Sequence, residues 1–250
     1  MNKSKQSKQK QILNEDTRKT LKELIPLSNK FVLRNRTIFS DEYKQVICSV
    51  DLEQLGEDFE KPIYINDTST FLSAVDLVDS PEITINDRII NIKNDYQTIN
   101  YITSGENSID ESKYSIIEST KKVNSLISFK LTSNLINDIK RAKSVLKEGI
   151  DTVFIEKTKD KLLLNLSINE TFNAASNEFK IEIKEYEFDP DQGLETFVTK
   201  VPVDTFLKIP EIDYNFEVKY NKDKDSYRIY MCSESEGDTP LIELIASTIR

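Results

Sequence analysis

The sequence predicts an α+β protein in which mostly antiparallel strands form the sheets and a few helices pack on one face of them. Short segments of alternating apolar and polar residues recur from residue 31 almost to the C-terminus, which is typical of strands. Helical periodicity is confined to four segments. The order helix, strands, short helix, strand pair and strand occurs twice, and this repetition predicts two similar halves produced by internal duplication.

Residues 131–147 give the strongest helix signal. One face is apolar at helical spacing and consists of Leu135, Ile136, Ile139, Ala142, Val145 and Leu146. The opposite face is polar and basic, with Asn137, Lys140, Ser144 and Lys147 on it and Arg141 and Lys143 beside them. Thr132 or Ser133 is suited to cap the N-terminus, and Gly149 is suited to end the helix.

Three weaker helices are predicted. The first covers residues 15–27, with Asp16 or Thr17 as its N-cap and Pro26 near its end. Its apolar side is Leu21, Leu24 and Ile25, and its polar side carries Arg18, Lys19 and Lys22. The second covers residues 67–78, with the apolar residues Phe71, Leu72, Val75, Leu77 and Val78. The last covers residues 204–209 and is ended by Pro210.

Strands account for most of the remaining pattern. They are predicted at residues 31–33, 37–39, 43–50, 61–65, 82–85, 89–92, 97–103, 126–131, 152–156, 161–166, 179–188, 197–201, 214–220, 227–232 and 241–246. The internal repeat is clearest where Thr70-Phe71-Leu72 and Thr205-Phe206-Leu207 each open a helix between a short strand and a turn-linked strand pair. The shared order of elements, more than the three-residue match, carries the prediction of a duplication.

Composition suggests where the domains begin and end. Residues 1–14 are rich in Lys, Gln and Ser and predict a disordered basic tail. Residues 15–109 then form a first domain and residues 123–250 a second. Between them, the polar and weakly patterned stretch 104–122 predicts a connector, with residues 110–122 as the link proper.

Charge and composition argue against catalysis and membrane insertion. The chain has a net charge of −9 and no histidine, the commonest general base and metal ligand, and it has no phosphate-binding loop or nucleophile elbow, so we expect no enzyme, metal or cofactor. No apolar run of about 18 residues occurs, nor a secretory leader, so we expect a cytoplasmic protein without membrane contact. Cys48 and Cys232 are then expected to be buried free thiols.

The charge is unevenly spread along the chain. Residues 1–30 contain eight Lys and Arg against three acidic residues, a net +5, so the rest of the −9 chain carries −14. A strongly acidic exterior disfavours indiscriminate binding to nucleic acid. If the protein meets DNA, it does so on a restricted face.

These patterns resemble the DNA polymerase sliding clamp of T-even-type tailed phages, a family related to proliferating cell nuclear antigen. The likeness covers about residues 15–250 and rests on the first helix at 16–27, on IYINDTSTFLSAVDLVDSPEITINDRIINI at 63–92 and on ISFKLTSNLINDIKRA at 127–142. The basic tail at 1–14 departs from the family, whose chains usually begin close to the first helix. It is either an extra DNA contact or a disordered extension.

The resemblance implies a processivity factor rather than an enzyme. Chains of this size in the family close head-to-tail as homotrimers, with helices lining a central hole and sheets outside. Such a ring encircles double-stranded DNA without reading its sequence, tethers the replicative DNA polymerase and is opened by a clamp loader ATPase. In T-even-like phages it also supports late viral transcription, which would place the protein in the cytoplasm of an infected host cell.

The resemblance assigns two candidate sites. The DNA-facing residues would be Arg18, Lys19, Lys22, Lys140, Arg141, Lys143 and Lys147. The alternative is that these side chains form an ordinary solvated face, and the absence of Lys and Arg from the helix at 67–78 argues against a uniformly basic lining. The partner pocket would be built from Tyr114, Ile116, Leu241, Ile242 and Leu244, which are otherwise plain core or strand residues.

Two other classes of function fit the sequence. One is a non-enzymatic virion or scaffold protein built from duplicated β-rich domains, and the other is a hydrolase that uses a pair of carboxylates. The oligomeric state distinguishes them, because a closed trimer favours the clamp and an open or very large assembly favours a scaffold. A metal-dependent activity would favour the hydrolase.

Overall fold

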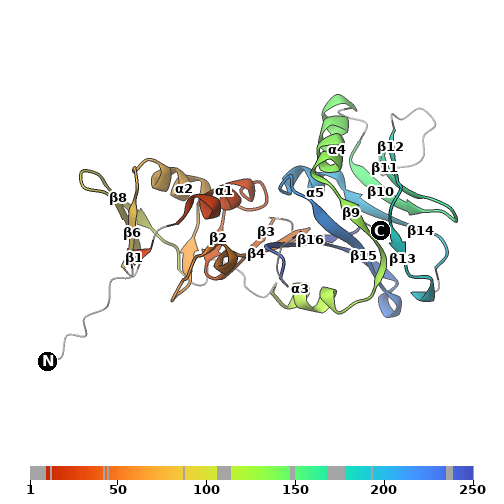
Figure 1. Ribbon diagram of the computed structural model, residues 1–250, viewed down its shortest axis with the longest axis horizontal. Coiled ribbons are helices and arrows are strands. Elements are labelled where there is room, and N and C mark those ends of the chain that lie inside the picture. Colours follow the sequence, from red (N-terminus) through yellow and green to blue (C-terminus); the bar gives the residue numbers. More distant parts are fainter. Residues whose placement is uncertain are drawn as a thin grey trace. The chain divides into compact units, whose positions relative to one another are not determined.

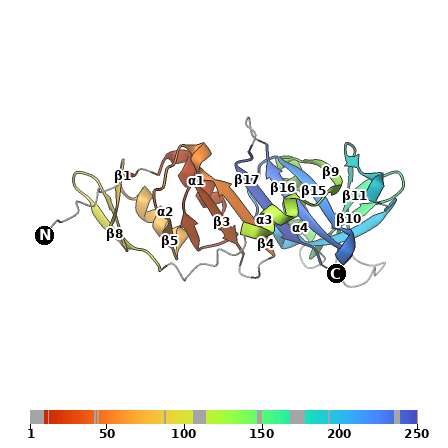
Figure 2. The same cartoon turned by 90° about the horizontal axis from the view of Figure 1, so that it is seen from below.

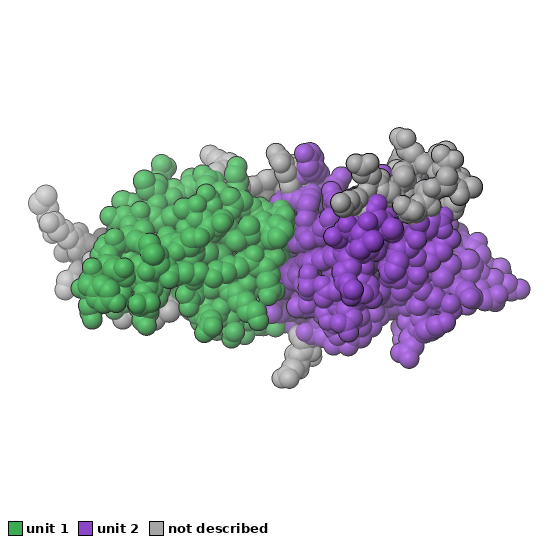
Figure 3. All heavy atoms as spheres, turned by 90° about the horizontal axis from the view of Figure 1, so that it is seen from above, with its two compact units in different colours: residues 1–39, 51–111 green, residues 40–50, 112–250 purple. Residues whose placement is uncertain are grey.

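The computed structural model describes residues 10–11, 13–41, 43, 45–86, 88–105, 114–146, 150–167, 178–192, 194–234 and 239–249. The chain divides into two compact units (Figure 3). Unit 1 contains the described residues of Met1–Phe39 and Asp51–Glu111, and unit 2 those of Ser40–Val50 and Ser112–Arg250. Residues 40–50, which we expected in the first domain, therefore belong to the second unit.

Unit 1 contains a four-stranded sheet, a strand pair and two α-helices (Figure 1). The sheet has the order β1-β6-β7-β8, with bounds Lys10–Gln11, Glu82–Asn86, Ile89–Lys93 and Thr98–Ile102. The separate pair is β2 (Phe31–Leu33) with β5 (Ile63–Ile65). The helices are α1 (Glu15–Glu23) and α2 (Thr68–Asp76), which contact each other, and a 3-10 turn lies at Leu52–Leu55.

Apolar burial on α1 and α2 holds unit 1 together. Leu21 and Leu24 are buried at and just after the end of α1, and Phe71, Leu72 and Val75 are buried on α2. The ring of Phe71 lies edge-on to those of Phe31 and Tyr101, with centroids 6.5 and 5.2 Å apart. These rings connect α2 to both groups of strands, and buried aromatic pairs of this geometry add to the burial of their surface.

Unit 2 is built on two sheets. The larger has the order β13-β9-β15-β16-β17-β4-β3, with bounds Glu187–Phe188, Ser125–Leu131, Tyr214–Asn221, Ser226–Ser233, Ile242–Ser247, Val46–Asp51 and Arg36–Ser40. Of these strands, residues 36–39 of β3 and Asp51 of β4 are assigned to unit 1. The smaller has the order β12-β11-β10-β14, with bounds Phe179–Ile183, Leu162–Ser167, Thr152–Lys157 and Phe197–Pro202. Its helices are α3 (Tyr114–Lys121), α4 (Ser133–Leu146) and α5 (Val203–Lys208), with short 3-10 turns at Pro190–Gln192 and Lys222–Lys224. Helix α4 contacts α5, and α3 contacts β16 and β17 (Figures 1 and 2).

The two units repeat the same pairings, which confirms the predicted duplication. In unit 1 the order β1-β6-β7-β8 and the pair β2–β5 correspond to β9-β15-β16-β17 and the pair β10–β14 of unit 2. The contact of α1 with α2 corresponds to that of α4 with α5. Phe71 and Phe206, from the two Thr-Phe-Leu segments, are each 1% exposed and therefore have the same core role.

The structure corrects several predicted helix details. Asn14, rather than Asp16 or Thr17, caps α1, because its side chain accepts the N–H of Thr17 at 2.8 Å. The helix ends at Glu23, before the predicted end at residue 27. One predicted detail is confirmed, since Thr132, one of the two expected N-cap residues, caps α4 by accepting the N–H of Leu135 at 3.2 Å. Leu77 and Val145, predicted on apolar faces, are 68% and 77% exposed. Leu77 is the C-cap residue just after the end of α2, and Val145 lies outside the set of buried residues on α4, Ile136, Ile139 and Ala142.

The structure also corrects the predictions for the strands, the tail and the connector. The predicted strand at 179–188 is two strands, since β12 pairs with β11 and β13 pairs with β9 of the other sheet. Part of the predicted disordered tail is ordered, because β1 pairs with β6 through Lys10 and Gln11. Residues 1–9 lie outside the described residues. The predicted connector contains the helix α3, which its weak pattern did not reveal.

Both cysteines are free thiols. Cys48 is buried, and its burial raises the pKa of the thiol. Cys232 is only half-buried, contrary to the prediction, and desolvation raises its pKa as well. A raised thiol pKa keeps cysteine protonated and unreactive at neutral pH.

Candidate nucleic-acid interface and partner surface

Helix α4 presents three of the predicted DNA-facing cations in different environments. The Nζ atom of Lys140 lies 2.8 Å from Oε1 of Glu211 and also donates to the carbonyl oxygen of Ile209 at 3.3 Å. The hydrogen bond from Lys140 lowers the pKa of Glu211 below its usual value. Lys140 is therefore engaged by the segment that follows α5, and its charge is largely balanced there.

The other cations of α4 divide into one that is bound locally and one that is exposed. Lys143 donates to the carbonyl oxygen of Ile150, beyond the end of its own helix. Arg141 is exposed and has no ion-pair partner within the part of the chain that the structure describes. Lys147 lies outside the described residues. Arg141 is thus the cation of α4 that is available to an external anion.

On α1, two of the three predicted cations share one acidic partner. Arg18 and Lys22 lie 3.1 and 2.5 Å from the two carboxylate oxygens of Asp76, the last residue of α2. Lys19 is exposed and has no ion-pair partner among the described side chains. The two helices of unit 1 are therefore linked by ion pairs, and two of the three cations of α1 have an acidic partner within the unit.

The helix charges differ between the units. Helix α1 contains three basic residues and three acidic ones, and α2 contributes only Asp76. Helix α4 contains Lys140, Arg141 and Lys143 against Asp138, and α5 contains one charge of each sign. The net positive helix surface therefore lies on α4 in unit 2. Sequence reasoning missed the neutralising carboxylates of Asp76 and Glu211 because they come from other elements.

The N-terminus of α4 is fixed by a third carboxylate. The backbone N–H of Ser133 donates to Oδ1 of Asp213 at 2.8 Å, and Lys130 lies 3.2 Å from Oδ2 of the same residue. These contacts, the backbone hydrogen bond first, lower the pKa of Asp213. A carboxylate at a helix N-terminus satisfies a free N–H group and complements the helix dipole.

The residues predicted for the partner pocket have different exposures. Ile242 and Leu244 lie on β17 and are 2% and 0% exposed, so both are core residues in this structure. Ile116 on α3 and Leu241 before β17 are partly exposed. The side chain of Tyr114 lies outside the described residues. The pocket thus stays a prediction, with Ile116 and Leu241 as its accessible members.

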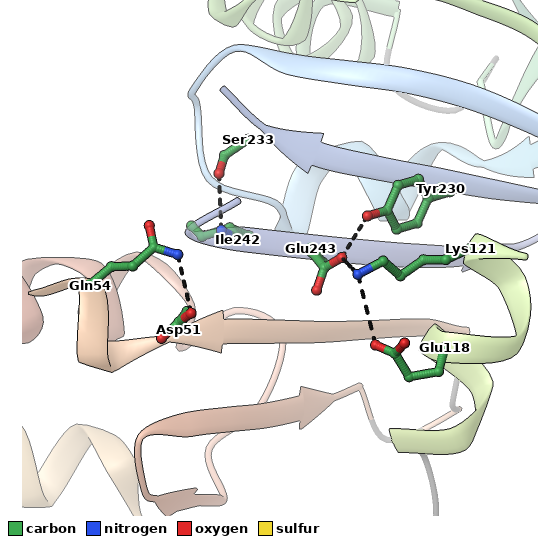
Figure 4. Close-up of polar contacts among 8 residues, drawn as sticks. All are labelled: Asp51, Gln54, Glu118, Lys121, Tyr230, Ser233, Ile242 and Glu243. Carbon is green, nitrogen blue, oxygen red and sulfur yellow. Dashed lines mark hydrogen bonds and ion pairs between the residues drawn. The ribbon is translucent and has the colours of Figure 1, made fainter. Parts of the chain in front are cut away.

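A buried polar network under α3 was not predicted from the sequence. Glu243 on β17 is 1% exposed, and its Oε1 accepts the hydroxyl of Tyr230 at 2.6 Å. Lys121 at the end of α3 lies 2.7 Å from the same oxygen (Figure 4). Alternation along β17 would place Glu243 on one face, but only the fold shows that α3 covers that face.

Within the described part of the chain, no group of three or more His, Cys, Asp or Glu side chains is placed to hold a metal ion. No helix among the described residues is both long and apolar enough to cross a membrane.

No protein-family profile matches the chain, and no curated protein sequence matches it. Solved structures do match. The proliferating cellular nuclear antigen of Entamoeba histolytica has a TM-score of 0.62 at 10% identity, over 93% of this chain and 94% of that one. The PCNA2–PCNA3 complex of Sulfolobus tokodaii gives 0.60 at 9% identity, over 91% and 93%. The Helicobacter pylori beta clamp bound to a DNA ligase peptide gives 0.59 at 12% identity, over 96% and 66%.

The chain therefore has the fold of the DNA sliding clamps, which combines duplicated α+β units with antiparallel sheets. The predicted fold class is confirmed. The match spans nearly the whole of the Entamoeba histolytica chain, whereas it spans 63% and 66% of two Helicobacter pylori beta-clamp chains and 64% of a putative DNA polymerase III beta subunit of Eubacterium rectale.

Proposed function

We propose that this protein is a DNA sliding clamp, a non-enzymatic ring that encircles duplex DNA and tethers a replicative polymerase. The observation that carries the proposal is the correspondence of fold with proliferating cellular nuclear antigen over 93% of this chain and 94% of the other. A clamp acts by topological linkage, so it needs a closed ring and weak contacts with phosphates, and it needs no catalytic residue. An ATP-driven loader would open the ring.

The repeat within the chain supports a head-to-tail ring. In unit 2 the strand β17 is paired with β4 in antiparallel register, from Ile242 opposite Val50 to Ala246 opposite Val46. By order and pairing, β8 is the equivalent of β17, and β12 is the equivalent of β4. Both β8 and β12 are edges of their sheets among the described strands. Pairing β8 of one copy with β12 of the next would repeat the internal contact and close a homotrimer.

The edge at β8 has an apolar surface suited to this contact. Ile102 on β8 and its cross-strand neighbour Ile89 on β7 are 74% and 42% exposed. On β12 the side chains of Phe179, Ile181 and Ile183 share one face and are partly exposed. Exposed apolar edge strands invite pairing with another chain unless they are covered, so a ring contact is a physically reasonable use of them.

The oligomeric state tests ring closure directly. Light scattering after size-exclusion chromatography should give a trimer for the native protein, and Ile102→Lys should reduce it to smaller species. Val198→Lys is the matched control, because Val198 is also exposed, at 55%, on a strand outside the expected contact. A native protein that is monomeric at every concentration, or that forms open filaments, would contradict the ring and would favour a scaffold.

DNA contact would fall mainly on α4, whose free cation is Arg141. Lys19 on α1 is the second free candidate, whereas Arg18, Lys22 and Lys140 are ion-paired. Exposed charges of this kind each contribute less than about 1 kcal/mol, so the effect should be collective and should weaken as salt is added. The test is processive synthesis on a primed template in the presence of loader and polymerase, measured over a range of salt concentrations. Support of late viral transcription, expected from the phage likeness, is a further use of the same ring.

A further inference from the structure

The carboxylate of Asp76 in unit 1 lies against two cations of α1 at once. The guanidinium of Arg18 is 3.1 Å from its Oδ1 atom, and the ammonium of Lys22 is 2.5 Å from its Oδ2 atom. Arg18 and Lys22 are four residues apart, so they lie on the same side of α1, and α1 contacts α2 (Figure 1). One negative charge therefore offsets part of the field of two positive charges.

The stability of α2 does not explain the position of Asp76. It is the last residue of α2, where a negative charge opposes the helix dipole. Its two ion pairs are partly exposed, since the side chains of Arg18 and Lys22 are 25% and 48% accessible, and exposed ion pairs contribute little to stability. The main physical effect of Asp76 is therefore on the charge that α1 presents to its surroundings.

Unit 2 repeats this arrangement with other residues. Glu211, in the segment after α5, lies 2.8 Å from Lys140 of α4. Asp41, between β3 and β4, lies 3.5 Å from Lys208 at the end of α5. Among the described ion pairs, each of these carboxylates has one cation, whereas Asp76 has two. Four cations on α1, α4 and α5 thus have an acidic partner that comes from another element.

A paired carboxylate reduces the number of phosphates that a helix surface can bind. Each cation that binds a phosphate releases counterions from DNA, so both the affinity and its salt dependence grow with the number of such contacts. A cation that is already paired forms this contact less readily, because the neighbouring carboxylate repels the phosphate. Of the predicted DNA-facing residues, Lys19 and Arg141 are exposed and lack an acidic partner within the described chain. The helix surfaces can therefore attract duplex DNA without binding it tightly.

We propose that Asp76 and Glu211 weaken the contact with duplex DNA, so that a ring of this protein stays on DNA by linkage and slides on few phosphate contacts. This role rests on the proposed function and names the residues that set the strength of DNA contact. A surface with more unpaired cations would make more phosphate contacts, and these would have to break whenever the ring moves along the duplex.

The test compares two substitutions that remove the same charge but release different numbers of cations. Asp76→Asn releases Arg18 and Lys22, so it should steepen the dependence of log affinity on log salt by about two. Glu211→Gln releases Lys140 alone and should steepen it by about one. The measurement is the affinity of the full chain for a short fluorescent linear duplex over a range of salt concentrations.

Further variants show whether the effect passes through the cations. Adding Arg18→Gln and Lys22→Gln to Asp76→Asn should remove the increase in slope, because no cation is left to release. Asp95→Asn makes the same charge change at an exposed turn of unit 1 and should leave the slope as it is. A comparison in the native background does not depend on whether Asp76→Asn folds. There Lys19→Gln should lower the slope by about one, and Lys22→Gln should lower it by less.

Three results would overturn this role. One is an equal slope in Asp76→Asn and Asp95→Asn, and another is an equal increase in Asp76→Asn and Glu211→Gln, which would mean that only net charge matters. The third is equal losses in Lys19→Gln and Lys22→Gln. The proposed function has a separate measurement, because a clamp should be retained on circular plasmid DNA and released when the plasmid is cut. Absence of that retention, with the expected slopes intact, would refute the clamp alone.

Discussion

The ammonium of Lys140 on α4 lies 2.8 Å from a carboxylate oxygen of Glu211, a residue 71 positions further along the chain. The contact joins the longest helix of unit 2 to the segment after α5. Lys140, which we expected to face DNA, is therefore one member of a partly exposed ion pair. Such pairs contribute little to stability, so their main effect here is on the charge that α4 presents.

Removing the acidic partner should therefore strengthen DNA binding. In Glu211→Gln, Lys140 keeps its position but loses its counter-charge, and one more phosphate contact should steepen the dependence of log affinity on log salt by about one. The measurement is affinity for duplex DNA over a range of salt. Glu195→Gln, at an exposed position of the same unit, is the control for net charge. Equal gains in both variants would mean that Lys140 does not reach DNA.

Arg141 should matter more for loading than the other cations of α4, because it is exposed and unpaired among the described residues. Arg141→Glu should leave the fold and the oligomer unchanged but should lower processive synthesis, most strongly at low salt where phosphate attraction is least screened. Lys224→Glu makes the same charge change at an exposed turn. If the two variants behave alike, α4 is only a solvated face.

The N-cap of α2 should be a measurable source of stability. Oδ1 of Asp67 accepts the N–H of Thr70 at 2.9 Å, and Oδ2 accepts its hydroxyl at 2.7 Å. Asp67→Ala should lower the free energy of unfolding by about 1 kcal/mol, as measured by denaturant titration at neutral pH. Asn66→Ala, at the exposed neighbouring position, should have no comparable effect.

The same cap predicts a pH dependence. The hydrogen bonds from Thr70 lower the pKa of Asp67 below the value of 3.8 that it has without the fold. A lowered pKa in the folded state means that the stabilisation is complete above the unfolded value and is lost as pH falls through the folded one. The difference in stability between the native chain and Asp67→Ala should therefore shrink below about pH 4. A difference that is constant between pH 7 and pH 3 would show that the charge of Asp67 is not involved.

Tyr230 should stabilise unit 2 through its hydroxyl. Tyr230→Phe keeps the ring but leaves the buried carboxylate of Glu243 with one donor fewer, at a cost of about 1.5–3 kcal/mol for a hydrogen bond to a charged group. Tyr96→Phe removes the hydroxyl of a residue that is 75% exposed and should change stability by less than about 0.5 kcal/mol. The stability of both variants is measured by thermal unfolding. Equal losses of stability in Tyr230→Phe and Tyr96→Phe would contradict the prediction.

The sequence by itself determined the fold class, the duplication and most elements. Alternation locates the hairpin of β10 and β11 and the pair β15–β16, and helical spacing locates α4, because these signals depend on which side chains of one segment must be buried. The buried residues Ile136, Ile139 and Ala142 confirm the apolar face predicted for α4. Local patterns of this kind are readable without knowing what the segment packs against.

Tertiary structure alone decided which charges are free and which segments meet. Asp76 pairs with Arg18 and Lys22, Glu211 pairs with Lys140, and Glu243 pairs with Lys121. The partners are far apart in the sequence, so the periodicity of a single segment cannot predict these pairs. Helix α3 escaped prediction because its stability comes from contacts with β16 and β17 rather than from a strong pattern of its own. An ion pair depends on the positions of two side chains in space, and only the folded chain fixes both.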